Sequence, residues 1–196
     1  MTLSKAVLKA ELLKIIDSAN PNFVGWPADP ATATSNFATA YNTYAIQATD
    51  ISGDMLVTAN LPGFITAITS AMPPPVPGGT LANYATTMGL ALTAYWTGAI
   101  FAILIPPPPG IPVPPNNGIF SIEATSLVTI VNAAILQNAI LAQLNQQFDS
   151  ADDAADAVAD VWHTATTTAI TVVIAGLDST PPPIGPWPII NTNLVF

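Results

Sequence analysis

The sequence contains no arginine and no cysteine, one histidine, and only three lysines, Lys5, Lys9 and Lys14. The formal net charge is −9. Proteins that bind nucleic acid neutralise phosphates with Lys or Arg, so this deficit excludes a nucleic-acid partner and disfavours anionic membrane surfaces. The lack of cysteine excludes disulfides and thiolate metal sites, and it leaves the redox compartment undetermined.

Charged side chains of either sign are scarce. They make up 8% of the chain, and none lies between Asp54 and Glu123. The surface of a soluble monomer typically carries about a quarter or more charged residues. Here either Thr, Asn, Ser and Gln supply the polar surface, or neighbouring subunits cover it. The second arrangement is typical of a subunit in a permanent assembly.

Half of the residues are hydrophobic, but few are aromatic, and the apolar positions recur mostly at helical spacing. This pattern predicts a mainly α fold, a helical bundle with long proline-rich connections and a few short β segments. The β-branched run at 169–175 and the segment 118–121 are the predicted strands. The predicted helices span 3–17, 33–48, 55–71, 81–105, 122–148 and 151–162.

Proline-rich stretches separate these segments. Runs at 72–79, 106–115 and 181–188 are predicted to be stiff, extended connections. They suggest three regions: an amino-terminal amphipathic helix (1–18), a helical core domain (19–180) and an extended carboxy-terminal arm (181–196). Two helical pairs, each followed by prolines, also suggest a loose internal duplication.

No residue pattern indicates an active site. His163 is the only histidine, and no serine lies in a G-x-S-x-G motif, so a Ser-His-Asp triad is disfavoured. Asp149, Asp153, Asp156 and Asp160 share one helix face but lack the spacing of an EF-hand loop. We interpret them as a solvated face, with an ionic contact to the lysine-bearing helix as an alternative. We expect no enzyme activity, cofactor, metal or small-molecule substrate.

The carboxy-terminal segment is the predicted protein-interaction site. It is apolar, can form a strand and follows a proline spacer, so it could add an edge strand to a neighbour or return to its own core. The lysine-bearing helix is the second candidate. The predicted interaction residues are Trp187, Ile189, Ile190, Leu194, Val195, Phe196, Lys5, Lys9 and Lys14.

A membrane protein is the alternative interpretation. The uncharged stretch 81–105 exceeds the roughly 20 residues that a membrane-spanning helix needs. The stretch 126–144 would supply a second span. Both contain Asn, Thr or Gln side chains, and no Lys or Arg flanks the first stretch to set its orientation. We therefore favour buried helices in an assembly.

Several segments resemble small structural proteins of tailed bacteriophages. They are the opening 3–12, the segment 40–45 (AYNTYA), the segment 94–97 (AYWT), and the Ala- and Thr-rich helices joined by proline tracts. The resemblance implies a virion component of the neck, tail or baseplate, assembled in the host cytoplasm. Its partners would be other virion proteins or copies of itself. The resemblance carries over no functional residue.

Overall fold

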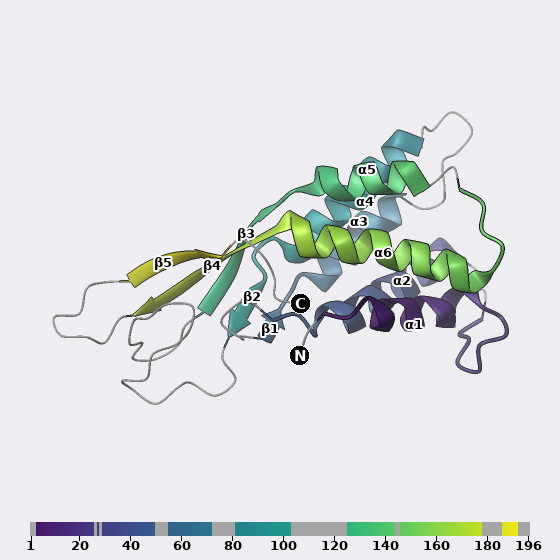
Figure 1. Ribbon diagram of the computed structural model, residues 1–196, viewed down its shortest axis with the longest axis horizontal. Helices are drawn as coiled ribbons and strands as arrows, with labels where there is room; N and C mark the ends of the chain where they lie inside the picture. Colours follow the sequence, from purple (N-terminus) through teal and green to yellow (C-terminus); the bar gives the residue numbers. More distant parts are fainter. Residues whose placement is uncertain are drawn as a thin grey trace.

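Six helices form a closed ring in the part of the chain that the structure describes. The computed structural model describes residues 3–25, 27, 29–49, 55–71, 81–102, 125–143, 146–177 and 186–191. Each helix packs against the next in sequence, and α6 packs against α1, which closes the ring (Figure 1). The predicted mainly α class is confirmed. The helices are α1 (Lys5–Ile16), α2 (Pro30–Ala45), α3 (Leu61–Ala71), α4 (Leu81–Trp96), α5 (Ala133–Gln143) and α6 (Ala151–Ala169).

An antiparallel sheet extends from one end of this ring (Figure 1). Its strands pair in the order of the sequence, and the β3–β4 ladder runs from Thr125 opposite Ala175 to Val131 opposite Ile170. Each strand of the sheet therefore pairs with the strands that come before and after it in the sequence, without crossovers. The strands are β1 (Met55–Thr58), β2 (Ile100–Ala102), β3 (Thr125–Val131), β4 (Ile170–Leu177) and β5 (Pro186–Asn191).

The element order strand, helix, helix, strand occurs twice, as β1-α3-α4-β2 and as β3-α5-α6-β4. The two units share a detail where the chain enters the ring. The N–H of Asn60 donates to the carbonyl of Tyr95 at 3.0 Å, and the N–H of Asn132 donates to the carbonyl of Ala169 at 2.8 Å. Each asparagine side chain also accepts a backbone N–H from the first turn of the helix that follows. The loose duplication in the sequence thus has a structural counterpart.

Aromatic side chains fill the ring where it meets the sheet. Tyr41 lies at the centre, with ring centroids 5.0 Å from Phe64, 5.2 Å from Tyr95 and 5.1 Å from Trp162. These contacts have tilted or edge-to-face geometry, which aromatic quadrupoles favour. The four residues come from α2, α3, α4 and α6, so their contacts hold these four helices together.

Two long predicted helices are wrong over part of their length. The predicted helix 81–105 ends at Trp96, because Gly98 adopts φ +75°, a backbone conformation that ends helices and that glycine tolerates. The predicted helix 122–148 contains strand β3 before α5 begins. Its β-branched residues pair with β4, and this long-range pairing outweighs the local helical spacing.

The other predicted helices agree better with the structure. The predicted helix 55–71 is β1 followed by α3, so its first residues form a strand instead. Helix α2 begins earlier than predicted, because Asp29 caps it and Pro30 occupies its first turn. Helix α6 is longer than the predicted 151–162, and β4 matches the predicted strand at 169–175. The predicted strand at 118–121 lies outside the described residues.

No helix in the described parts of the chain is long and apolar enough to cross a membrane. The two spans considered from sequence are each broken by a strand. Residues 100–102 form β2, and residues 125–131 form β3.

Candidate functional site

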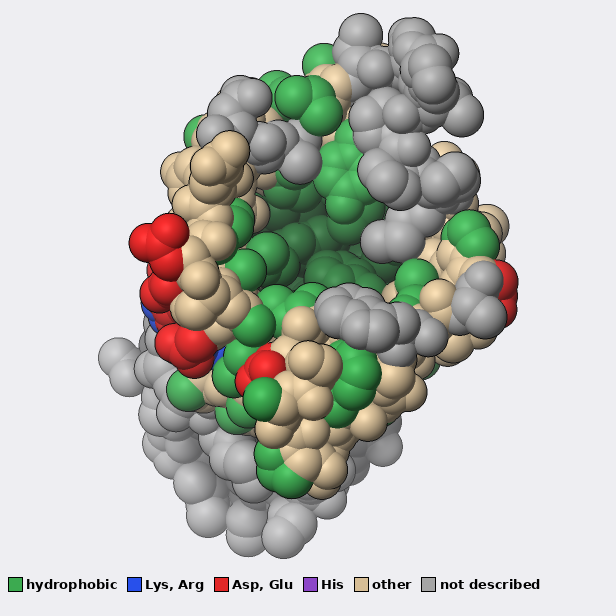
Figure 2. Space-filling model, turned by 90° about the vertical axis from the view of Figure 1, so that its right-hand side faces the viewer, with side chains coloured by type: hydrophobic (Ala, Val, Ile, Leu, Met, Phe, Trp, Pro, Cys, Tyr) green, Lys and Arg blue, Asp and Glu red, His purple; other side chains and the backbone are tan. Residues whose placement is uncertain are grey.

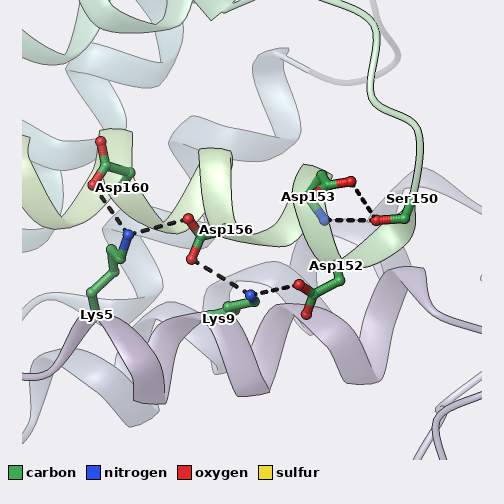
Figure 3. A network of polar contacts seen from close by, with 7 residues as sticks. All are labelled: Lys5, Lys9, Ser150, Asp152, Asp153, Asp156 and Asp160. Atoms are coloured by element: carbon green, nitrogen blue, oxygen red, sulfur yellow. Dashed lines mark hydrogen bonds and ion pairs between the residues drawn. The ribbon is translucent and has the colours of Figure 1, made fainter.

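The lysine-bearing helix is joined to the acidic helix by a ladder of ion pairs (Figure 3). Lys5 Nζ lies 3.2 Å from a carboxylate oxygen of Asp156 and 3.4 Å from one of Asp160. Lys9 Nζ lies 2.9 Å from Asp152 and 3.6 Å from Asp156. Of the interpretations drawn from sequence, the ionic contact between the two helices is therefore realised, and it forms within one chain. It closes the helical ring between its first and last members.

The ladder shifts the proton affinity of its members. The hydrogen bond from Lys5 holds the pKa of the Asp156 carboxyl below its usual range. The hydrogen bond to Asp156 raises the pKa of Lys5, and the one to Asp152 raises the pKa of Lys9. The lowered pKa of the aspartate and the raised pKa values of the lysines all favour the charged forms of these side chains. Because the pairs are partly exposed, salt screens them.

Lys14 lies apart from this ladder and pairs with Glu11 on its own helix. All three lysines thus form ion pairs within the chain. They belong to internal contacts in the structure, and a partner would have to compete for them.

The polar and acidic residues at the start of α6 stabilise the first turn of this helix. The Ser150 hydroxyl accepts the backbone N–H of Asp153 at 3.1 Å and bonds to the Asp153 carboxylate at 2.6 Å (Figure 3). Asp152 and Asp153 in the first turn are favourable to the helix dipole. Among the described residues, no group of three or more His, Cys, Asp or Glu side chains is arranged to hold a metal ion.

His163 contacts the buried core through Tyr44. Its Nδ1 lies 2.7 Å from the hydroxyl of Tyr44, and the two rings meet edge to face with centroids 5.8 Å apart. Partial burial lowers the pKa of His163, an effect that Asp160 opposes and Lys5 reinforces. A neutral imidazole whose Nδ1 accepts a hydrogen bond from the Tyr44 hydroxyl fits this geometry, which indicates a packing role.

The carboxy-terminal candidate residues divide into two groups. Trp187, Ile189 and Ile190 lie in β5, which pairs with β4 of the same chain, so this part returns to its own sheet. Leu194, Val195 and Phe196 lie outside the described residues. Strand β5 is the last strand of the sheet, and contact between a partner and its outer edge remains a prediction.

One side of the ring carries no charge. The described residues 55–71, 81–102 and 125–143, which include α3, α4 and α5, contain no Asp, Glu, Lys, Arg or His. Helix α4 exposes Asn83, Thr86 and Leu90, and Leu90 is 55% exposed. The charged helices α1 and α6 lie next to each other elsewhere in the ring. Among the described helices, α1 and α6 therefore form a charged side of the ring, and α3, α4 and α5 form a neutral side. Charge sparsity was visible in the sequence, but its confinement to one side of a ring was not.

The ring is hollow at the end that faces away from the sheet. Figure 2 looks into this end and shows a depression whose walls and floor are hydrophobic, with acidic side chains on its outer rim. A cavity of about 230 Å³ opens there. Helices α1, α2, α4, α5 and α6 contribute its lining, which consists of Leu12, Ile16, Phe37, Tyr84, Met88, Ile140, Gln143, Val158 and Trp162. Sequence reasoning missed this cavity, since its lining residues look like ordinary core positions.

Comparison of this chain with models of known protein families, with curated proteins and with solved structures finds no match.

Proposed function

We propose that this chain is a structural subunit of a larger assembly and acts through protein–protein contacts. The observation that carries the proposal is the neutral side of the ring. Helices α3, α4 and α5 follow one another there without a single charged residue in the parts that the structure describes. A surface of this kind is poorly suited to permanent exposure and well suited to burial against a neighbouring subunit.

The projecting sheet supports the same proposal. Its outer part extends beyond the helices, so no described helix covers either face there (Figure 1). Alternate residues of a strand point to opposite faces, and strands that are apolar in both sets are typical of sheets buried on both sides. The sequence of β4, ITVVIAGL, contains a single polar residue, Thr171, and so fits this composition.

The resemblance to small structural proteins of tailed bacteriophages makes a virion the assembly to test. In that setting the partners are other virion proteins or further copies of this chain, in the neck, tail or baseplate. The ion pairs of the lysines support a protein partner over nucleic acid, because Lys5, Lys9 and Lys14 all pair with carboxylates of the same chain.

The experiment is a mass measurement of the purified chain in detergent-free buffer, by light scattering after size exclusion. We expect a discrete oligomer, or a monomer that co-sediments with particles. A monomer that associates with neither itself nor particles would contradict the proposal, and so would a chain that stays dispersed only in detergent.

A pair of variants locates the contact. Leu90→Arg places a charge on the neutral side, where Leu90 is 55% exposed, and should weaken the association. Ala10→Arg places the same charge on the exposed surface of α1 and serves as the matched control. If both variants associate like the parent chain, the neutral side of α4 is not the interface.

A further inference from the structure

We propose that the open cavity of the helical ring is a binding site for a small, neutral, apolar molecule. The inference is independent of the proposed assembly role. It rests on the closure of the ring, the aromatic floor and the composition of the lining.

The cavity follows from the arrangement of the helices. Six helices in a closed ring leave an axial space, and at the sheet end this space is filled by the aromatic cluster around Tyr41. Trp162 belongs to both the cluster and the lining. Phe37, whose ring centroid lies 5.2 Å from that of Trp162, also lines the cavity, so these two rings form the floor. Towards the opposite end the side chains no longer meet, and the space stays open (Figure 2).

The lining selects the class of ligand. None of the nine lining residues is charged, and their polar atoms are limited to the Gln143 amide, the Tyr84 hydroxyl and the Trp162 indole N–H. Burial raises the pKa of Tyr84, as expected beside an apolar space. A charged group would lose its hydration without an ionic partner here, and a peptide segment would leave most of its backbone groups without hydrogen bonds.

The size fits a single ring or a short hydrocarbon chain. In other proteins an apolar cavity of about 150 Å³ stays dry and binds benzene. The present cavity, at about 230 Å³, is larger, so it has room for a ligand of this size. Gln143, in the last turn of α5, can satisfy one polar atom of a ligand.

Benzene and benzoate form the test pair, because they share a ring and differ in charge. In protein labelled with ¹³C at the methionine methyl groups, Met88 lines the cavity and Met55 in β1 does not. Signals are assigned with Met88→Leu and Met55→Leu. We expect benzene to shift the Met88 signal saturably, with a millimolar or tighter dissociation constant, and to leave the Met55 signal in place. Benzoate should have no such effect.

Two pairs of variants separate the cavity from the rest of the fold. Val158→Phe fills the cavity and should weaken benzene binding by about tenfold or more. Val161→Phe makes the same change on α6 at a partly buried position outside the lining, and should bind like the parent chain. Gln143→Glu adds charge to the lining and should weaken binding severalfold, whereas Gln146→Glu adds it at an exposed position outside the lining. Circular dichroism verifies folding, and the Gln pair keeps the test decisive if a Phe variant fails to fold.

Several results would overturn the proposal. They are the absence of saturable shifts up to the solubility limit of benzene, equal shifts at Met55 and Met88, equal binding of benzoate, and equal effects of the two members of the Gln pair. A high-resolution structure that shows the cavity filled by side chains of the chain itself or of a second copy would also overturn it.

Discussion

The hydroxyl of Tyr41 lies 2.7 Å from the hydroxyl of Thr166, and both residues are fully buried. Thr166 also lies 2.7 Å from the carbonyl oxygen of Trp162, which can only accept a hydrogen bond. The Thr166 proton is therefore directed to that carbonyl, and Tyr41 donates to Thr166. The oxygen of Tyr41 in turn accepts the indole N–H of Trp96 at 2.7 Å. One phenol thus links α2, α4 and α6 in the middle of the ring.

The first prediction concerns this phenol. Tyr41→Phe leaves the Trp96 N–H buried without its acceptor, so we expect the free energy of unfolding to fall by about 1–3 kcal/mol. Guanidinium denaturation measures the change. Tyr95→Phe is the control, because it removes a single hydrogen bond, to Asn42, whose side chain is only partly buried. A loss for Tyr41→Phe no larger than that for Tyr95→Phe would show that the network adds nothing beyond one ordinary bond.

The second prediction concerns the ion-pair ladder. Lys9→Gln removes contacts to Asp152 and Asp156, so α1 and α6 hold together less well and the free energy of unfolding falls. Because the pairs are partly exposed, we expect the difference from the parent chain to shrink as sodium chloride rises towards about 1 M. Lys14→Gln removes the same charge but only a contact within α1, and it should cost less stability at low salt. A loss for Lys9→Gln that does not depend on salt would contradict the electrostatic explanation.

The third prediction concerns the dependence of stability on pH through His163. Its pKa in the folded chain lies below the ordinary value of 6.5, so the unfolded chain binds a proton first as the pH falls. The stabilising contribution is complete above pH 6.5 and is lost progressively below it, down to the folded pKa. We expect His163→Gln to flatten the decline in stability between pH 7.5 and 5.5. NMR titration of the imidazole gives the pKa directly, and a value above 6.5 would reverse the sign.

The fourth prediction concerns Gly89, which is buried on α4. Exchange of a helical glycine for alanine normally stabilises a helix, by about 1 kcal/mol. Here a methyl group would lie 2.6 Å from the Cγ atom of Gln137 and 2.9 Å from the carbonyl oxygen of Ala133, a backbone atom of α5 that cannot easily move. We therefore expect Gly89→Ala to destabilise the fold by roughly 1–3 kcal/mol in thermal or chemical unfolding.

An exposed residue on another helix provides the control for that experiment. Ser35→Ala changes an exposed side chain on α2, outside the neutral side, and should alter stability by no more than about 0.5 kcal/mol. Stabilisation by Gly89→Ala would mean that α4 and α5 can separate at little cost.

Local features of the chain were predictable. The periodic apolar residues of α1, the capping residue Ser150 before α6 and the β-branched run of β4 each act over a few residues, so they can be identified in the linear sequence. The two glycines near α4 have different roles that depend on the tertiary structure. Gly89 lets α5 approach closely, and Gly98 follows the end of α4 with a positive φ.

Long-range features were not predictable. The apolar segment 125–131 has a spacing compatible with a helix, and it becomes a strand because β2 and β4 pair with it on both sides. Nothing in the spacing of Lys5 or Lys9 identifies Asp152, Asp156 or Asp160 as partners in the same chain, since about 150 residues separate them.

The sequence by itself determined a sparsely charged, mainly helical chain with too few cations to neutralise a nucleic acid, because composition and helical periodicity are properties of residues and their near neighbours. Only the tertiary structure decided that the helices close into a ring, that the charged helices α1 and α6 lie side by side in it, and that aromatic residues fill one end while the other stays open. Those features depend on contacts between residues far apart in the chain. Packing and pairing geometry selects such contacts, and local propensity does not.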